Sequence, residues 1–330
     1  MNHRGDAMEV RLRNGIHLPG CGLWLDPKRK APIGVVSHAH SDHAGWHEVT
    51  IATPATMDLM RARKPPPAGI TLVELPYREI FTTDRARITL IPAGHVFGSA
   101  QVLVETEEGS LLYTGDFKRG ESLTCEAAAS VRAGTLVTEC TFGRSRYAFP
   151  PIEETRKRIV GFCNRVLIEG ETPVLLAYSL GKAQELMAIL SREGISPVIH
   201  ESVAAMSAVY AKHGVDLGSH MVWNGRNHGG RVMIIPPNAR RRLAALGNIR
   251  SAVLSGWALN ADAVYRYGCD EAFPLSDHAD HGELIEHVEE VCARRVYTVH
   301  GFTEEFAGDL RYLGMDALAL GGGNQLELLR

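Results

Sequence analysis

The sequence predicts an α/β fold, and the different patterns of two stretches along its 330 residues indicate this class. Short apolar runs separated by turn residues dominate the first 140 residues, whereas strands and helices alternate after Pro150, which is typical of a parallel sheet. Hydrophobic residues make up 45% and charged residues 22% of the chain, so disordered, collagen-like and coiled-coil classes are excluded. The length suits roughly two domains at about 150 residues each.

The elements follow in order from runs of β-forming residues and from helical periodicity. In the first part we expect strands at residues 9–13, 33–37, 87–91, 101–105, 110–114 and 135–138. The alternating part predicts helices at 153–168 and 182–191 and strands at 173–178, 197–200, 231–235 and 250–255. The tail predicts a helix from residue 283, a strand at 295–299, a helix at 304–313 and a last strand at 317–320.

Charge is unevenly distributed, although the net charge is only −3. Residues 151–269 have 14 Lys and Arg against 9 Asp and Glu, and residues 217–261 contain no acidic residue. This asymmetry indicates a surface that faces a polyanion, although a solvated helix face would explain the charge equally well. No apolar run reaches the ~18 to 20 residues that cross a bilayer, and the N-terminal stretch is polar, so we expect a cytoplasmic protein with no membrane contact.

A histidine-rich segment is the strongest functional signal. Four potential metal ligands, His38, His40, Asp42 and His43, directly follow an apolar run. Residues two apart in an extended segment point the same way, so His38 and His40 can reach one ion while the other two face a neighbouring ion. Zinc accepts such ligands, and so do manganese and iron. The six cysteines form no C-x-x-C pair, which argues against a thiolate zinc site and a disulfide framework.

Further ligand candidates lie at the ends of expected strands. His95 follows a glycine, and Asp116 closes a Thr-Gly-Asp sequence. Each alone is weak, because Gly-His and Gly-Asp are common in turns, but together with the first cluster they gain weight. Near the C-terminus, His278 lies in a Ser-Asp-His-Ala-Asp-His cluster and His300 lies in Val-His-Gly.

These motifs, in this order, resemble the β-CASP nucleases of the metallo-β-lactamase fold. The resemblance spans residues 26–301 and rests on motifs at 38–43, 94–95, 114–116, 138–141, 177–186, 276–278 and 299–301. It implies an αββα sandwich built from residues 1–150 and 270–330, with residues 151–269 inserted as a parallel α/β cap over the metal site. Ser255-Gly256-Trp257 and the compact length look closest to bacterial DNA ligase-associated exonucleases, relatives of Artemis-type nucleases, which implies association with a DNA ligase/helicase repair system.

The resemblance also implies two divalent metal ions, zinc or manganese, as cofactors. His38, His40 and His95 would hold the first ion. Asp42, His43 and His300 would hold the second, and Asp116 would bridge the two. Asp26 would brace the ligand loop from behind. A histidine at position 300 is typical of the RNA-processing members and not of the Artemis-type enzymes, so the choice between DNA and RNA stays open.

Glu139 and His278 match the acid/base pair of the family, and Asp42 is counted with them as catalytic. We expect Glu139 to keep His278 protonated, so that His278 donates a proton to the leaving sugar oxygen. Alternatively, His278 is a polar residue in a helix-capping region formed by Ser276 and Asp277.

Six basic residues are expected to contact nucleic acid: Arg144, Arg146, Lys182, Arg240, Arg241 and Arg242. A hinge loop would equally explain the first two, and an exposed lysine in the first turn of a helix would explain Lys182. Four aromatic residues are candidates for base stacking, although aromatics in α/β segments more often belong to the core: Trp223, Tyr210, Tyr178 and Trp257.

The leading hypothesis is therefore a metal-dependent exonuclease that hydrolyses phosphodiester bonds of DNA during repair. A β-CASP ribonuclease keeps the chemistry and changes the substrate. A lactonase or thioesterase shares the H-x-H-x-D-H core but needs neither an arginine-rich insertion nor a partner for His278. A nucleic-acid-binding protein without activity is disfavoured, because every metal-ligand position is filled.

Overall fold

The computed structural model describes residues 8–226, 229–245, 247–260 and 262–321. Residues 1–7 of the polar N-terminal stretch and Ala261 at the end of the acid-free stretch lie outside the described residues. The chain divides into two compact units. Unit 1 contains Met1–Gly120, Glu126–Ala148 and His278–Arg330, and unit 2 contains Glu121–Cys125 and Phe149–Asp277.

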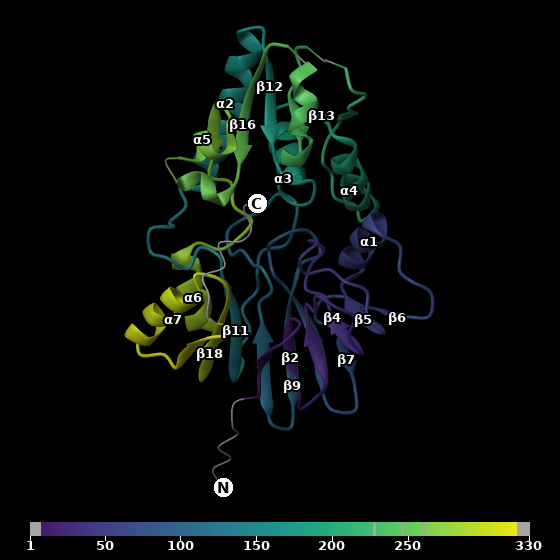
Figure 1. Cartoon of the computed structure of the whole chain (residues 1–330), viewed down its shortest axis with the longest axis vertical. Coiled ribbons are helices and arrows are strands. Elements are labelled where there is room, and N and C mark those ends of the chain that lie inside the picture. The colour runs from purple at the N-terminus through teal and green to yellow at the C-terminus, as the bar shows by residue number, and fades with distance from the viewer. Residues whose placement is uncertain (1–7, 227–228, 246, 261, 322–330) are drawn as a thin grey trace. The chain divides into compact units, whose positions relative to one another are not determined.

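Unit 1 contains two sheets (Figure 1). The first runs in the order β1 (Arg11–Leu12), β2 (Ile16–Leu18), β3 (Leu23–Leu25), β4 (Ile33–Val35), β5 (Val49–Ala52) and β6 (Thr71–Glu74). The second runs in the order β19 (Ala317–Ala319), β18 (Arg295–Gly301), β11 (Thr135–Cys140), β10 (Gly109–Tyr113), β9 (Ala100–Thr106), β8 (Arg87–Pro92) and β7 (Ile80–Thr82). The helices of this unit are α1 (Pro54–Arg63), α6 (His281–Val291) and α7 (Thr303–Tyr312).

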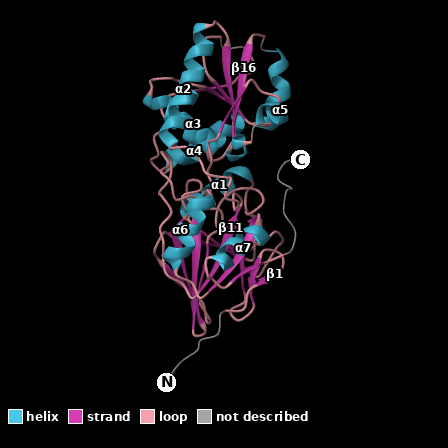
Figure 2. Ribbon diagram, turned by 90° about the vertical axis from the view of Figure 1, so that its left-hand side faces the viewer, coloured by secondary structure: helices cyan, strands magenta, loops and turns pink. Residues whose placement is uncertain are grey.

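The alternation of side chains along β10 explains how the layers of unit 1 pack. Leu111 and Tyr113 point into an apolar core that also contains Leu25 and Ile51 of the first sheet. Leu112 points the other way, into a second core with residues of α6 and α7, which flank this sheet in Figure 2. Because successive residues of a strand face opposite sides, the second sheet is buried on both faces. The loops that follow β8 and β10 of this sheet contain His95 and Asp116.

Unit 2 is built on a six-stranded sheet whose strands are all parallel. Its order is β14 (Met221–Val222), β13 (Val198–Ile199), β15 (Met233–Ile235), β12 (Thr172–Leu176), β16 (Ile249–Leu254) and β17 (Glu271–Phe273). The other elements are α2 (Ile152–Ile168), α3 (Lys182–Arg192), α4 (Glu201–Lys212), the 3₁₀ helices η1 (Pro237–Ala245) and η2 (Gly256–Leu259), and α5 (Ala263–Tyr267). The expected parallel α/β pattern is confirmed.

The unit boundary near residue 270 lies further along the chain than the sequence pattern indicated. We expected the inserted segment to end at residue 269, whereas unit 2 continues to Asp277, because β17 pairs with β16 in its sheet. Helix α6 begins at His281 with Asp280 as its N-cap, and the Asp280 side chain accepts a hydrogen bond from the Glu283 amide. The idea that Ser276 and Asp277 cap this helix is therefore wrong. Among the described residues, no helix is long and apolar enough to cross a membrane.

Candidate metal centre

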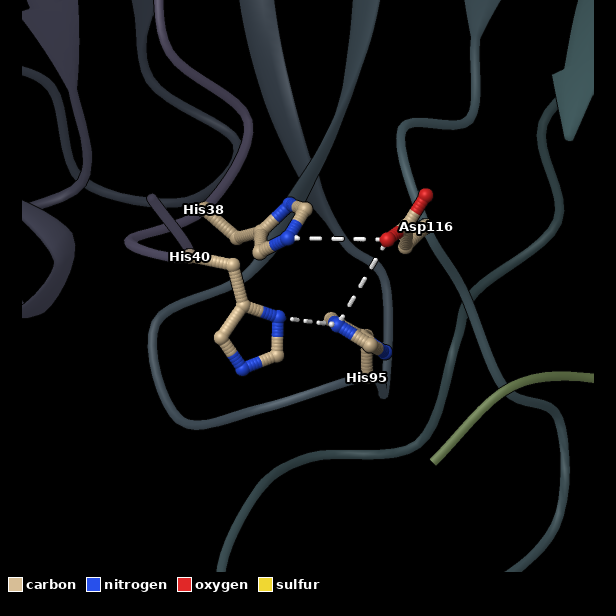
Figure 3. A group of neighbouring side chains, drawn as sticks. All are labelled: His38, His40, His95 and Asp116. Carbon is tan, nitrogen blue, oxygen red and sulfur yellow. Dashed lines mark hydrogen bonds and ion pairs between the residues drawn. The ribbon is translucent and has the colours of Figure 1, made fainter. Parts of the chain in front are cut away.

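Three loops that follow strands β4, β8 and β10 bring a group of histidines and one aspartate together (Figure 3). His38 and His40 come from the first loop, His95 from the second and Asp116 from the third. The ligand atoms of these four side chains all lie within 4.8 Å of one another, and three of the four side chains are buried. The sequence therefore carries a candidate metal-binding cluster at this place.

The distances around Asp116 match the spacing of ligands on a metal ion. Its Oδ2 atom lies 3.6 Å from Nε2 of His38, 3.5 Å from Nε2 of His43 and 3.8 Å from Nε2 of His95. These separations are too long for hydrogen bonds. Two ligand atoms that are each about 2.0 to 2.2 Å from one zinc ion lie roughly 3 to 4 Å apart. Each of the three histidine nitrogens is therefore spaced from Asp116 Oδ2 as two ligands of one cation would be.

The protonation states of the cluster also fit a cation. Nε2 of His38 is buried and has no hydrogen-bond partner among the described residues, which is costly unless a ligand occupies its lone pair. Burial, and then the charges of His43 and the other nearby histidines, lower the pKa of His38 well below its ordinary value, so its ring is neutral. Burial raises the pKa of Asp116 to about 7. A divalent ion would hold this carboxylate ionised and use the free imidazole nitrogen.

Asp26 organises the histidine loop from behind. Its Oδ1 accepts a hydrogen bond from the Ser37 amide at 2.7 Å. Its Oδ2 accepts from the Ser37 hydroxyl at 2.6 Å and from the Tyr113 hydroxyl at 2.9 Å. The same oxygen lies 2.8 Å from Nδ1 of His43. With its proton on Nδ1, His43 presents Nε2 to Asp116, as a metal ligand would. Burial opposes the charged form of His43, yet Asp116 and Asp26 together raise its pKa to about 10.

Helix α1 supports both histidine loops at once. In its last turn, the Arg63 guanidinium donates to the Ala39 carbonyl at 2.7 Å. At its start, the hydroxyls of Thr53 and Thr56 donate to the Gly98 carbonyl at 2.7 and 2.8 Å. Together with Ser37 and Tyr113, these residues are positioning groups that our sequence reasoning missed. Ser37 and Tyr113 left a signal, because each directly precedes one of the ligand motifs.

Asp42 and His300 lie at the edge of this cluster. Oδ2 of Asp42 is 3.7 Å from Nε2 of His43, and the Asp42 side chain is 45% exposed. The rings of His43 and His300 have their centroids 5.3 Å apart. All three residues line a cavity of about 340 Å³. Burial lowers the pKa of His300 to about 4, so this ring is neutral as well.

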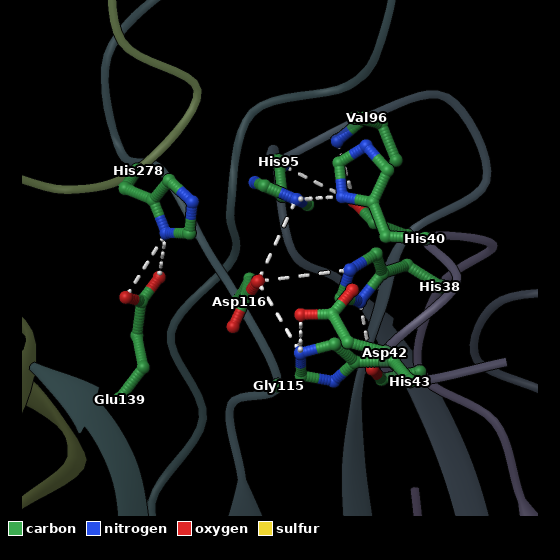
Figure 4. A network of polar contacts seen from close by, with 12 residues as sticks. His38, His40, Asp42, His43, His95, Val96, Gly115, Asp116, Glu139 and His278 are labelled. Carbon is green, nitrogen blue, oxygen red and sulfur yellow. Dashed lines mark hydrogen bonds and ion pairs between the residues drawn. The ribbon is translucent and has the colours of Figure 1, made fainter. Parts of the chain in front are cut away.

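Glu139 and His278 form a pair beside the cluster (Figure 4). Nδ1 of His278 lies 2.8 and 3.0 Å from the two oxygens of Glu139, which is fully buried at the end of β11. Glu139 also accepts hydrogen bonds from the Phe117 amide at 2.8 Å and from the Thr141 hydroxyl at 2.5 Å. Burial acts to raise the pKa of Glu139, but His278 and these hydrogen bonds lower it overall, so the carboxylate is ionised.

Two residues of the cluster, Asp116 and His95, lie next to the acid/base pair. Ligand atoms of Asp116, Glu139 and His278 lie within 4.8 Å of one another. The rings of His95 and His278 are 4.6 Å apart. With Nδ1 bonded to Glu139, the other nitrogen of His278 is the one that can exchange a proton with a substrate at the cluster.

The expected nucleic-acid contacts have different surroundings. Arg144 pairs with Glu305 at 2.5 Å and stacks on the Phe302 ring at 3.9 Å. Arg146 is exposed and donates to the Tyr147 hydroxyl at 2.8 Å. Lys182 is buried and donates to Asp277 in unit 2, so the alternative of an exposed lysine is wrong.

The three consecutive arginines of η1 differ from one another. The Arg240 guanidinium donates to the carbonyls of Tyr267 and Gly268, and so supports the end of α5. Arg241 is exposed. Arg242 lies over the Trp223 ring at 4.5 Å, and its side chain is 47% exposed.

Burial removes two of the four candidates for base stacking. Tyr210 is 0% and Trp223 is 5% exposed, so both belong to the core of unit 2, and the stacking prediction is wrong for them. Tyr178 is 52% exposed. Its ring lies 5.4 Å from the Lys182 ammonium.

The fold and the site define a class, an α/β protein with a histidine- and aspartate-rich candidate metal centre. Comparison with curated proteins finds 41% identity over 323 residues, 97% of this chain, to a protein of Opitutus terrae named probable DNA ligase. It also finds 33% identity over 125 residues, 37% of this chain, to the endoribonuclease ysh1 of Aspergillus fumigatus. The chain spans 32% of the first relative and 14% of the second.

Among solved structures, a protein of unknown function from Enterococcus faecalis V583 has the same fold, with a TM-score of 0.57 and 12% identity. The match covers 88% of this chain and 80% of that one. No protein-family model matches the chain. The named relatives indicate a β-CASP metallo-β-lactamase nuclease family, in agreement with the resemblance of the motifs.

Proposed function

We propose that the chain is a metal-dependent nuclease that hydrolyses phosphodiester bonds of DNA and removes nucleotides from strand ends during repair. One observation carries the proposal. A single oxygen of Asp116 lies 3.5 to 3.8 Å from three imidazole nitrogens, and the pair of buried Glu139 and half-buried His278 lies beside it. Phosphodiester hydrolysis needs these two parts, a place for cations that neutralise the phosphate and a group that protonates the leaving oxygen.

The residues have separate roles in this proposal. His38, His40 and His95 would hold one divalent ion, Asp42, His43 and His300 a second, and Asp116 would bridge both. Zinc or manganese in these positions would supply an activated water and offset the charge of the phosphate oxygens. His278 donates the proton to the leaving sugar oxygen, and Glu139 holds the His278 ring through Nδ1. Asp26 keeps the proton of His43 on Nδ1.

DNA is favoured as the substrate because the relative that matches nearly the whole chain is named probable DNA ligase. That relative is about three times longer than the match, so a nuclease acting together with a ligase in repair is a natural context. RNA is the second candidate. The partial match to an endoribonuclease and the presence of His300 favour it. A lactonase or thioesterase ranks lower, because a small neutral substrate has no need for the exposed arginines of unit 2.

The test compares DNA and RNA oligomers of one sequence, each labelled at the 5′ or the 3′ end, with zinc or manganese in one buffer. We expect progressive shortening of DNA from one end, and loss of this activity in His38→Ala and Asp116→Asn. The exposed histidine His220 provides a matched control, since His220→Ala should cleave like the wild type. Preferential degradation of RNA would favour the ribonuclease, and full activity of Asp116→Asn would overturn the metal-centred proposal.

A further inference from the structure

His300 is the extra residue of a β-bulge between β11 and β18. The parallel register pairs Glu139 with Val299 and Cys140 with Gly301, so His300 has no counterpart in β11. Its φ of 56° lies in the left-handed region, which is uncommon for residues other than glycine, although Asn, Asp and His adopt it more often than the rest. Bulges of this kind change the direction of a side chain and occur next to active sites.

The bulge changes where the His300 ring points. Val299 belongs to the apolar core between the two sheets, so a regular strand would send residue 300 toward the opposite face, which packs on α6 and α7. Instead, the His300 ring lies 5.3 Å from the His43 ring and lines the cavity that Asp42 and His43 also line. The backbone at this point therefore decides whether the imidazole reaches the candidate metal centre.

Cys140 makes the contacts that hold this backbone. Its thiol lies 3.2 Å from the His300 carbonyl and 3.4 Å from the Val299 carbonyl, so one S–H donor serves the two carbonyls that flank the left-handed step. Its own carbonyl accepts the Phe302 amide at 3.0 Å. At Gly301, whose φ is 96°, an added Cβ would lie only 2.3 Å from the Cys140 carbonyl oxygen, which excludes any other residue there.

A second layer of contacts secures the same segment. Arg144 stacks on Phe302 at 3.9 Å and pairs with Glu305 at 2.5 Å. The Gly143 amide donates to the Cys140 carbonyl at 3.0 Å. The turn after Glu139 thus encloses residues 300–302, and Arg144, which we expected at the nucleic acid, has a structural task here.

We propose that Cys140 is a positioning residue, whose thiol holds the left-handed bulge that directs His300 toward His43 and so completes the second metal position. This inference rests on the dinuclear site of the proposed function. It also explains why Glu139 and Cys140 are consecutive. The end of one strand orients the acid/base pair through Glu139 and a metal ligand through Cys140.

The test measures metal binding by the full chain in two ways. Titration with Co²⁺ gives the affinities from its absorption spectrum, and elemental analysis after zinc loading gives the number of ions bound. For Cys140→Ala we expect the first ion to bind as in the wild type and the second about 10-fold or more weaker, as is typical when a group that orients a ligand is lost. His300→Ala should show the same pattern. Cys140→Ser should retain most of the affinity, because its hydroxyl can donate to the same carbonyls.

Cys163→Ala is the matched control, since Cys163 is equally buried but lies in unit 2. It should bind both ions as the wild type does. Thermal unfolding of each variant in EDTA measures how much stability is lost when a buried cysteine is truncated. Wild-type affinity for both ions in Cys140→Ala, or an equal weakening of both, would overturn the inference. If the wild type binds two ions but cleaves no nucleic acid, the proposed function fails while the role of Cys140 stands.

Discussion

Replacing Asp26 tests how the histidine loop is held. The carboxylate accepts hydrogen bonds from the amide and hydroxyl of Ser37, from Nδ1 of His43 and from the Tyr113 hydroxyl, all within 2.6 to 2.9 Å. In Asp26→Ala four buried donors lose their acceptor. An unsatisfied buried donor costs about 1 to 3 kcal/mol, and neighbouring losses overlap, so we expect the metal-free protein to lose roughly 3 to 6 kcal/mol of unfolding free energy.

Urea unfolding with EDTA present measures this loss, because it removes any contribution of bound metal. Tyr113→Phe is the graded comparison, since it deletes one of the four donors together with its bond and should cost about 1 to 3 kcal/mol. Metal titration of Asp26→Asn adds an independent readout. With its amide in place of a carboxylate oxygen, it cannot hold the proton of His43 on Nδ1 as well, and we expect weaker binding at the second position. An Asp26→Ala protein within 1 kcal/mol of the wild type would refute this reasoning.

Four further predictions follow from single contacts. Glu139→Gln should lower kcat about 10²- to 10⁴-fold with unchanged metal content, and near-normal turnover would remove Glu139 from the acid/base pair. Gly34→Ala should cost about 1 to 3 kcal/mol of unfolding free energy in urea, because its Cβ would lie 2.2 Å from the buried His47 ring. Adding His47→Ala should recover part of that loss. A double variant whose loss equals the sum of the two single losses would contradict the contact. Burial, assisted by Arg119, lowers the pKa of His287 to about 4 from 6.5. Protonation therefore favours the unfolded chain, and the free energy of unfolding should fall as the pH drops from 6.5 toward 4. In His287→Leu this fall should be shallower, and equal slopes of unfolding free energy against pH in the two proteins would contradict the role of His287. Finally, Arg241→Ala with Arg242→Ala should reduce the slope of log affinity against log salt by about 1.4 for single-stranded DNA, whereas Arg240→Ala should leave the slope unchanged, and the opposite pattern would move the nucleic-acid path elsewhere.

Strong periodic patterns made much of the fold predictable. Helix α2 differs by one residue from the expected 153–168, since its buried face repeats at Ile159, Phe162 and Val166 and its first turn is acidic. The central strands β8 to β11 are buried and flanked by turn residues, so they too could be predicted from the sequence. Short strands such as β2 and β3, with three residues each, leave too few positions for a period to emerge.

Helix α4 was missed for a related reason. Its Ala- and Ser-rich sequence has little contrast between its faces, and its N-cap is His200, whose ring accepts from the Ser202 amide. Histidine is not a capping signal that sequence reasoning uses.

The candidate ligands could be found from the sequence because short spacing fixes which side chains share a direction. His38 and His40 form such a pair, whereas the assignment of His95 to the first ion and of Asp116 to the bridge relied on the resemblance. The supporting residues could not be found in this way. Asp26 and Tyr113 are 87 positions apart, and their hydrogen bond exists only because the two sheets pack face to face.

The contact between Cys140 and His300 depends likewise on a register shift between β11 and β18. Pattern reasoning assigns strands but not the single residue at which their pairing slips. For the same reason the pairing of Arg144 with Glu305, 161 positions away, could not be anticipated from a basic stretch.

The number of metal ions bound per chain tests the central claim most directly. Elemental analysis of the purified protein after zinc loading and removal of free metal, set beside Asp116→Asn and the control His220→Ala, gives this number. Our account predicts two ions in the wild type and in the control, and at most one in Asp116→Asn, because the proposed bridge is lost. A wild type that retains no ion, or an Asp116→Asn variant that retains two, would contradict it.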